Sequence, residues 1–378
     1  MRIDELKKDL LDLGLEENLY LGVLIYLTAT ARKTENKISV LVSGPAGLGK
    51  SHVVNSILGL FPDEDIISFS RITPAGLLTL EDLRHKILYI YEKFRDPQYS
   101  QYIRELITEG EVRYMTADGE RCLKGPTTVV ETTVNADVIG IENKSRCFSA
   151  GINKTTEART RILERQRTDR TIQGLQQERA LEALRAKHKT FQQGLKHIRV
   201  VIPFAEDIKF QCPSHHAARA QERLLNVICA IAFMDQQNRR KKAFEETIFI
   251  EARETDFEEV KEILTHIPID ENESMIPPQV AEFVNLIRVH KENLCRKPCF
   301  TRNDMLEVLP SDNVYRNYKA IVKILKVLSE FGFINEKPVR GIKNRAEYSF
   351  SNYFPKLPMN SSDLTCYASI SLAQFCHR

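Results

Sequence analysis

The stretch "VLVSGPAGLGKSHVV", residues 40–54, joins a short apolar run, a glycine-rich loop and the start of a helical pattern. The apolar run predicts a buried strand, and "HVVNSILGLF" after the loop predicts a helix. The loop fits G-x-x-x-x-G-K-[ST], a motif that requires this strand–loop–helix context. Its glycines let backbone N–H groups turn toward a phosphate, and a helix N-terminus adds partial positive charge. The stretch therefore predicts a nucleotide-binding site.

The candidate nucleotide ligands are the eight loop residues Gly44, Pro45, Ala46, Gly47, Leu48, Gly49, Lys50 and Ser51. In this motif the lysine reaches the β- and γ-phosphates and the hydroxyl holds Mg²⁺. We therefore expect ATP and Mg²⁺ as the cofactors.

A second apolar run, "KILYIY", predicts a buried strand that ends immediately before Glu92. In most P-loop ATPases such a strand ends in Asp-Glu, where the Asp holds the Mg²⁺ water shell and the Glu polarises the attacking water. Here Tyr91 stands at the Asp position. Glu92 is the candidate base, and metal coordination falls to Ser51 and Glu92. The alternative is that Glu92 only caps a strand end.

Composition limits the class of protein. The chain has 378 residues, 28% of them charged, and a net charge of +3, so any nucleic-acid surface has to come from local patches. No apolar run approaches a membrane span, and residues 1–14 are typical of an amphipathic helix rather than a signal peptide. The eight scattered cysteines suggest reduced thiols. We expect a protein of two or three domains in the cytoplasm, associated with the nucleoid, and no membrane partner.

Two alternating segments flank Asp118-Gly119, a hairpin turn signal. The hairpin carries three basic residues, Arg113, Arg121 and Lys124, which are candidate DNA contacts. The alternative is a sheet edge with solvated charges.

The next strand, "TTVVETTVNA", ends in polar residues, and Thr133 and Asn135 could sense a γ-phosphate by hydrogen bonding. In "ENKSRCFSAGIN", Arg146 stands in an apolar frame, as a finger for a neighbouring subunit's ATP would. A surface ion pair is the other interpretation of Arg146.

Residues 155–199 form a charged helical stretch with eleven Lys/Arg against five Asp/Glu, and Gly174 and Gly194 suggest breaks in it. This arm could face phosphates or be a solvated face. Beyond it, residues 217–242 predict an amphipathic helix with Arg219 at its start and Arg223 on the same face one turn later. Arg219 is a candidate for the nucleotide site, and ordinary helix-surface charge is the alternative.

The last third predicts helices over 277–294, from Thr301 with Asp304 as a capping box, and over 311–331. Two short strands follow around a basic loop at 340–345. Three helices and a two-stranded wing predict a winged helix, which places its third helix in the DNA major groove or serves as a protein-docking module. Its candidate DNA contacts are Arg316, Lys319, Lys323, Arg340, Lys343 and Arg345.

The order of these parts resembles the AAA+ ATPase core of MCM-like helicases, and more closely the primase-helicase proteins of bacterial plasmids, phages and mobile genetic elements. The resemblance covers about residues 16–351. It implies that residues 44–51 are the Walker A loop, that Glu92 is the Walker B glutamate, and that the basic hairpin is the pre-sensor-1 DNA hairpin. It also implies that Asn135 in "TTVNA" is the sensor residue, with Thr133 as the second candidate. It further implies that Arg146 in "SRCF" is the arginine finger and that Arg219 in "ARAQERLL" is the sensor-2 arginine.

The implied fold is α/β, an AAA+ P-loop ATPase domain with a helical extension followed by a C-terminal winged-helix domain. The expected domains are N-terminal helices at 1–30, the ATPase core at 31–205 with the basic arm at 155–199, a helical lid at 206–275, the winged helix at 276–355 and a tail at 356–378.

The implied function is an ATP-dependent DNA helicase or translocase of replication. The resemblance implies a ring, expected to be a hexamer, that works on single-stranded, forked or duplex DNA with a separate primase. Because no primase-like pattern precedes the loop, priming is not implied for this chain. One alternative is an ATP-controlled initiator or helicase loader that does not unwind DNA. Another is a small-molecule kinase, which the basic hairpin and the winged helix disfavour.

Overall fold

The computed structural model describes residues 1–80, 82–92, 96–116, 119–125, 127–134, 146–153, 155–208, 217–267, 299–308, 318–330, 334–338 and 346–350. The chain divides into two compact units. The first is built mainly from Met1–Ile208 and Gln221–Asn272, and the second from Lys209–Ala220 and Glu273–Cys376. The predicted helix over 277–294 lies outside the described residues.

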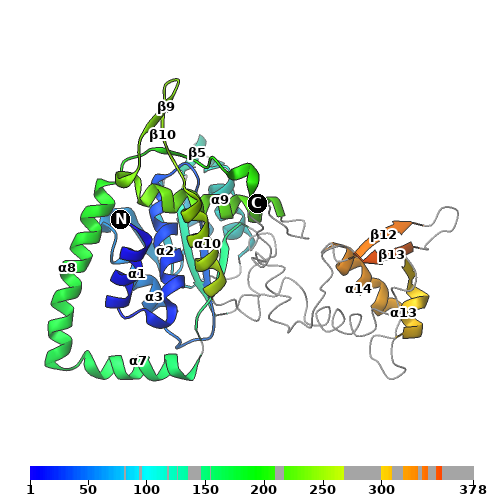
Figure 1. Ribbon diagram of the computed structural model, residues 1–378, viewed down its shortest axis with the longest axis horizontal. Helices are drawn as coiled ribbons and strands as arrows, with labels where there is room; N and C mark the ends of the chain where they lie inside the picture. The colour runs from blue at the N-terminus through cyan, green and yellow to red at the C-terminus, as the bar shows by residue number, and fades with distance from the viewer. Residues whose placement is uncertain are drawn as a thin grey trace. The chain divides into compact units, whose positions relative to one another are not determined.

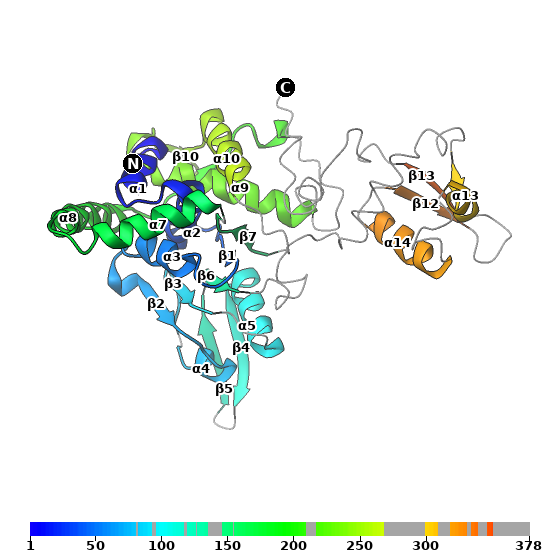
Figure 2. The same cartoon turned by 90° about the horizontal axis from the view of Figure 1, so that it is seen from below.

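A five-stranded parallel sheet forms the centre of the first unit (Figure 1), and its strands, labelled in Figure 2, lie in the order β2-β3-β6-β1-β7. Its strands are β1 (Val40–Ser43), β2 (Ile66–Phe69), β3 (Ile87–Ile90), β6 (Thr128–Thr133) and β7 (Phe148–Gly151). Every residue of the three inner strands β3, β6 and β1 is buried. Strands buried on both faces have apolar runs as their signal, which is why β1 and β3 were predictable. The α/β class with a parallel sheet is confirmed.

Helices surround this sheet in the first unit. They are α1 (Ile3–Asp12), α2 (Leu19–Thr30), α3 (Lys50–Leu58), α4 (Pro74–Leu78), α5 (Pro97–Thr108), α7 (Thr156–Thr168), α8 (Ile172–Gly194), α10 (Glu254–His266) and, from Gln221 on, α9 (Ala217–Met234). The amphipathic helix predicted at the N-terminus is α1, which buries Ile3, Leu6 and Leu10. By contrast, α2 is buried from Leu21 to Thr30, as an apolar helix inside the unit has to be.

One face of the sheet packs on α5 (Figure 2). Leu88, Ile90 and Val129 from the strands meet Tyr99 and Ile103 of the helix in a buried cluster. Successive residues of a strand point to opposite faces, so Tyr89, between Leu88 and Ile90, points the other way, toward Ser51 in the first turn of α3. The two faces of β3 therefore have different tasks, core packing on one and contact with the helix after the loop on the other.

The predicted hairpin is confirmed as β4 (Glu111–Thr116) paired antiparallel with β5 (Gly119–Lys124). Val112 and Leu123 at its base are buried in the same cluster as α5. Figure 2 shows the hairpin extending away from the sheet, and Met115 near its end is 77% exposed. A buried base and an exposed end suit a hairpin that contacts something outside the unit.

The basic arm is helical, as expected, but it breaks between α7 and α8, before Gly174 rather than at it. The Thr171 hydroxyl caps α8 by accepting from the N–H of Gly174. A Cβ on Gly174 would lie 2.6 Å from the Thr168 carbonyl oxygen, so the glycine permits the close approach at the corner. Gly194 is the last residue of α8, and that predicted break therefore ends the helix.

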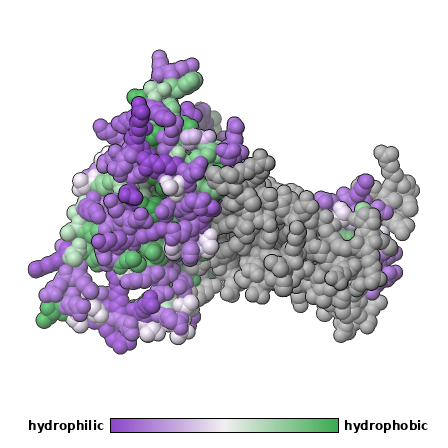
Figure 3. Space-filling view, viewed as in Figure 1, coloured by the Kyte–Doolittle hydropathy of each residue, from purple (hydrophilic) through white to green (hydrophobic). Residues whose placement is uncertain are grey.

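The arm is anchored by buried polar groups. His188 is fully buried, with Nδ1 2.9 Å from the Tyr26 hydroxyl of α2 and Nε2 3.0 Å from the Asp9 carboxylate of α1. Gln192, also fully buried, accepts from Arg32 at 2.9 Å. The apolar residues Ile172 and Leu175 of α8 are instead 77% and 61% exposed. Figure 3 shows apolar surface at the corner where α7 meets α8.

A three-stranded sheet within residues 199–251 was not predicted. Its order is β8-β10-β9, with β8 (Arg199–Val201) parallel and β9 (Lys242–Phe244) antiparallel to β10 (Thr247–Glu251). The β9–β10 hairpin projects from the unit, and Phe244 in it is 70% exposed (Figures 1 and 3). Its turn holds Glu245 at φ 51°, a position where glycine or asparagine is the usual signal.

The second unit contains two described helices, α13 (Arg302–Val308) and α14 (Tyr318–Glu330), and an antiparallel sheet in the order β11-β13-β12. The strands are β11 (Phe300–Thr301), β12 (Ile334–Pro338) and β13 (Ala346–Phe350). The predicted capping box is confirmed, since the Thr301 N–H donates to Asp304 at 2.7 Å and the Asp304 N–H donates back at 3.3 Å. Buried Ile321, Leu325 and Leu328 show that α14 has the helical spacing expected for 311–331.

Candidate functional site

The glycine loop between β1 and α3 has a backbone that only glycine adopts easily. Gly44, Gly47 and Gly49 have φ of 143°, 81° and 85°. A Cβ on Gly44 would lie 2.9 Å from Cγ2 of Ile152, whereas one on Gly47 would meet no atom within 4 Å. Gly44 therefore fits a crowded turn, whereas Gly47 borders open space beside the loop. Such a loop can bring backbone N–H groups close to an anion.

Lys50, the first residue of α3, folds over this loop. Its side chain is nearly buried, and Nζ donates to the carbonyl oxygens of Gly44 and Pro45 at 2.6 and 2.9 Å. Ser51, the next residue, is exposed, as are Pro45 and Ala46 in the loop. An ammonium group at an exposed loop and a helix N-terminus is a favourable place for a phosphate.

The ends of three neighbouring strands bring further predicted residues to the same edge of the sheet. Ser43 at the end of β1 is level with Thr133 of β6, which is 2% exposed. On the other side of β6, Ile90, the last residue of β3, is level with Glu131, and Glu92 follows two residues after the end of β3. Glu92 is exposed. Ligands of open α/β sheets bind at the carboxyl ends of the strands, so the loop and Glu92 share the edge where a ligand is expected.

Beneath the loop lies a cluster of hydroxyl groups. The Tyr89 side chain is 1% exposed, and its ring packs on that of Tyr91 with centroids 4.4 Å apart. Burial raises the pKa of Tyr89 to about 12, although the nearby hydroxyls of Ser51 and Thr132 act in the opposite direction. Thr132 in turn donates to the carbonyl oxygen of Tyr91. Tyr89 therefore stays protonated at neutral pH, next to the predicted Mg²⁺ ligand Ser51.

The residues at this edge fit a nucleotide with its Mg²⁺. Lys50 and the loop N–H groups would meet the phosphates, and Ser51 and Glu92 would hold the metal ion. Among the residues that the structure describes, no group of three or more His, Cys, Asp and Glu side chains could hold a metal. Mg²⁺ bound with a nucleotide needs few protein ligands, because phosphates and waters supply the others.

The structure does not bring Arg146 to the loop of its own chain. Arg146 precedes β7, and the first residue of β7, Phe148, is level with Val40 at the start of β1. Because the strands are parallel, Arg146 lies at the opposite edge of the sheet from the loop. One of its guanidinium nitrogens, Nη1, donates to the Thr108 hydroxyl at the end of α5.

The other predicted nucleotide-site residues are only partly placed. Arg219 lies in the first turn of α9 and is half-buried. Arg223, one turn later, has its guanidinium 5.5 Å from the centre of the Phe148 ring. Asn135 lies outside the described residues.

The predicted DNA contacts fall into two groups. On the hairpin, Arg113, Arg121 and Lys124 (the hairpin cations) are all exposed, and Arg113 pairs with Glu111 at 2.7 Å. In the second unit Lys323 is exposed on α14, which also carries Lys319. The remaining candidates lie outside the described residues: Arg316, Arg340, Lys343 and Arg345.

Tyr89 was not among the predicted site residues. A signal existed, because Tyr89 and Tyr91 alternate along an otherwise aliphatic strand, and alternate residues share a face. Which face meets α3 depends on how the sheet packs, and the sequence alone does not specify it.

Comparison with protein-family models gives no match, and comparison with curated proteins gives none either. Within the described residues, no helix is long and apolar enough to cross a membrane.

Proposed function

We propose that this protein is a P-loop ATPase of the AAA+ type that works on DNA, most simply as a replicative helicase or translocase. The observation that carries the proposal is the loop of Gly44, Gly47 and Gly49 in left-handed or related conformations, with Lys50 over it and Glu92 on the same sheet edge. Strand, loop and helix stand in the order that the G-x-x-x-x-G-K-[ST] motif requires.

Each residue has a role that its position supports. Loop N–H groups and Lys50 stabilise the phosphate oxygens, on which negative charge develops as the γ-phosphoryl group leaves. Bound Mg²⁺ would supply further charge neutralisation, held through Ser51. Glu92 orients the attacking water and accepts its proton. Thr133, with Asn135, would hydrogen-bond near the γ-phosphate at the end of the adjacent strand.

The position of Arg146 supports a ring of subunits. This side chain lies at the edge of the sheet away from its own loop, so as a finger it would act on the nucleotide of a neighbouring copy. An arginine supplied in trans to a transferring phosphoryl group is a recognised way of coupling hydrolysis to assembly. The number of subunits, a hexamer, comes from the resemblance alone.

The DNA part of the proposal has separate support. The hairpin cations lie on a hairpin whose base is in the ATPase core, so nucleotide-dependent movement of the core would move them. The second unit, with two helices and an antiparallel sheet, is compatible with a winged helix that grips the duplex. An initiator or loader would use the same residues without unwinding DNA, and a small-molecule kinase would need neither surface.

ATP hydrolysis measured with and without single-stranded DNA tests this proposal, with Lys50→Ala as the blank. We expect DNA to raise the rate and the wild-type protein to displace a strand from a forked duplex. Stimulation without strand displacement would favour the initiator or loader. A rate of ATP hydrolysis that single-stranded DNA does not change would contradict a DNA motor and favour the kinase.

A further inference from the structure

The Tyr89 hydroxyl is a buried polar group that the residues around it leave unsatisfied. Its oxygen has no accessible surface and no well-aligned hydrogen bond among the described residues. The Tyr89 hydroxyl lies beside the hydroxyls of Ser51 and Thr132, so a reorientation of either neighbour would give it a partner.

The hydrogen-bonding capacity of Thr132 decides which hydroxyl donates and which accepts in this cluster. Thr132 uses its only hydrogen on the Tyr91 carbonyl, so toward Tyr89 it can only accept. Tyr89 can therefore donate to Thr132, and its oxygen is left to accept from the Ser51 O–H. With those two bonds made, a chain of hydroxyls would run from Ser51 through Tyr89 and Thr132 to the Tyr91 carbonyl, where the bond from Thr132 is already present.

On the basis of the proposed nucleotide site, we propose that Tyr89 is a positioning residue for Ser51. It holds the Ser51 hydroxyl so that a lone pair of the Ser51 oxygen points toward the nucleotide-bound Mg²⁺. A Ser hydroxyl that coordinates a cation has to point its hydrogen away from the ion. Tyr89 is the acceptor in the right place for that hydrogen. Hydrogen bonds in such a chain polarise one another, which makes the Ser51 oxygen a better ligand.

This role compensates for the tyrosine at position 91. The aspartate that usually anchors the Mg²⁺ water shell is absent there, and the Tyr91 ring, 36% exposed, packs against Tyr89 instead. The metal site then depends on one oriented hydroxyl and Glu92. Partners of metal ligands contribute about 10–100-fold to metal affinity in well-studied sites.

Tyr89→Phe tests the proposal, because it removes one oxygen and keeps the ring. We would measure the affinity for AMP-PNP by calorimetry across a Mg²⁺ series and in excess EDTA. The Mg²⁺ concentration for half-maximal tight binding should rise by about tenfold in Tyr89→Phe, while the affinity in EDTA stays within about twofold of wild type. Thr132→Val should shift the Mg²⁺ midpoint in the same direction by less, since Tyr89 can still accept from the Ser51 O–H in this variant.

Two matched controls separate this effect from a loss of packing. Tyr91→Phe removes a phenol two residues away on the same strand face, and Thr128→Val removes a buried hydroxyl from β6 that has no partner among the described residues. Both should leave the Mg²⁺ midpoint unchanged. An unchanged midpoint in Tyr89→Phe, or equal weakening in Mg²⁺ and in EDTA, would overturn the role of Tyr89. Absence of any AMP-PNP binding by the wild type would instead overturn the nucleotide site itself.

Discussion

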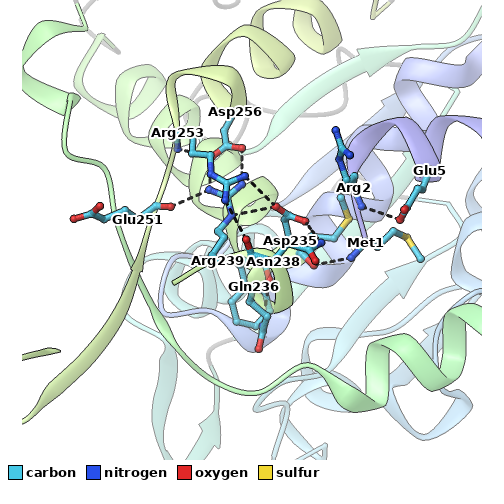
Figure 4. Close-up of polar contacts among 12 residues, drawn as sticks. Met1, Arg2, Glu5, Asp235, Gln236, Asn238, Arg239, Glu251, Arg253 and Asp256 are labelled. Carbon is cyan, nitrogen blue, oxygen red and sulfur yellow. Dashed lines mark hydrogen bonds and ion pairs between the residues drawn. The ribbon is translucent and has the colours of Figure 1, made fainter. Parts of the chain in front are cut away.

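The ion pair between Arg239 and Asp256 should be a main determinant of the stability of the first unit (Figure 4). The Arg239 side chain is 3% exposed and that of Asp256 is 6% exposed. Two guanidinium nitrogens of Arg239 donate to the two carboxylate oxygens at 2.8 and 2.7 Å, and Nη1 also donates to the Glu251 carbonyl at 2.9 Å. The pair thereby joins the turn after α9, the strand β10 and the first turn of α10.

Asp256→Ala should lower the free energy of unfolding by about 3–5 kcal/mol, because it leaves a buried guanidinium without its main counter-charge. The value should fall in the lower half of that range, since Asp235 remains 3.5 Å from Nε of Arg239. The substitution also removes the acceptor of the Arg253 N–H at the start of α10. Lys242→Ala is the control, because its pair with Glu251 has a similar length but side chains 46% and 34% exposed. It should cost less than about 1 kcal/mol.

Urea unfolding followed by far-ultraviolet circular dichroism measures both variants. The midpoint should fall clearly in Asp256→Ala with little change in the denaturant slope. A decrease in the free energy of unfolding below about 1 kcal/mol, or one equal to that of Lys242→Ala, would refute the reasoning that burial makes this pair dominant.

Three further outcomes are expected. Burial lowers the pKa of His188 below its usual 6.5, so as pH falls the unfolded chain takes up a proton at this residue before the folded chain does. The free energy of unfolding should therefore decrease below about pH 6.5, by at most about 1.4 kcal/mol per pH unit. Urea titrations of His188→Gln should show a shallower decrease, and a slope identical to that of the wild type would contradict this. Alanine at the hairpin cations should reduce the log–log salt slope of single-stranded DNA binding by about 0.7 for each phosphate-binding side chain removed, with Lys261→Ala as the unaffected control. Arg146→Ala should bind ATP but hydrolyse it poorly, and mixing it with Lys50→Ala should restore activity; co-assembly without rescue would exclude a finger in trans.

Much of the site was predictable because its signals are local. Glycine at fixed spacing, a lysine and a hydroxyl specify the loop, since the backbone there needs conformations that other residues avoid. The hairpin and the capping box at Thr301 were predictable for the same reason, because a turn or a cap is made by residues a few positions apart. The strand that precedes Glu92 was also predictable, because a short apolar run is a local signal.

The remaining features depend on contacts between distant parts of the chain. The sheet of β8, β9 and β10 joins segments far apart in the sequence of the first unit, and its turn lacks the usual glycine. The arm is held by His188 and Gln192, polar residues that pattern analysis assigns to a surface. Tyr89 gains its place beside Ser51 only because one face of β3 meets α3.

Comparing Glu92→Gln with Lys50→Ala tests the central claim most directly, with ATP binding and phosphate release measured on the same preparations. Lys50→Ala should lose both, because it removes the cation over the phosphate loop. Glu92→Gln should bind ATP as the wild type does and lose hydrolysis, because it keeps the loop and removes the base. Normal hydrolysis by Glu92→Gln, or normal ATP binding by Lys50→Ala, would contradict a nucleotide site at this edge of the sheet.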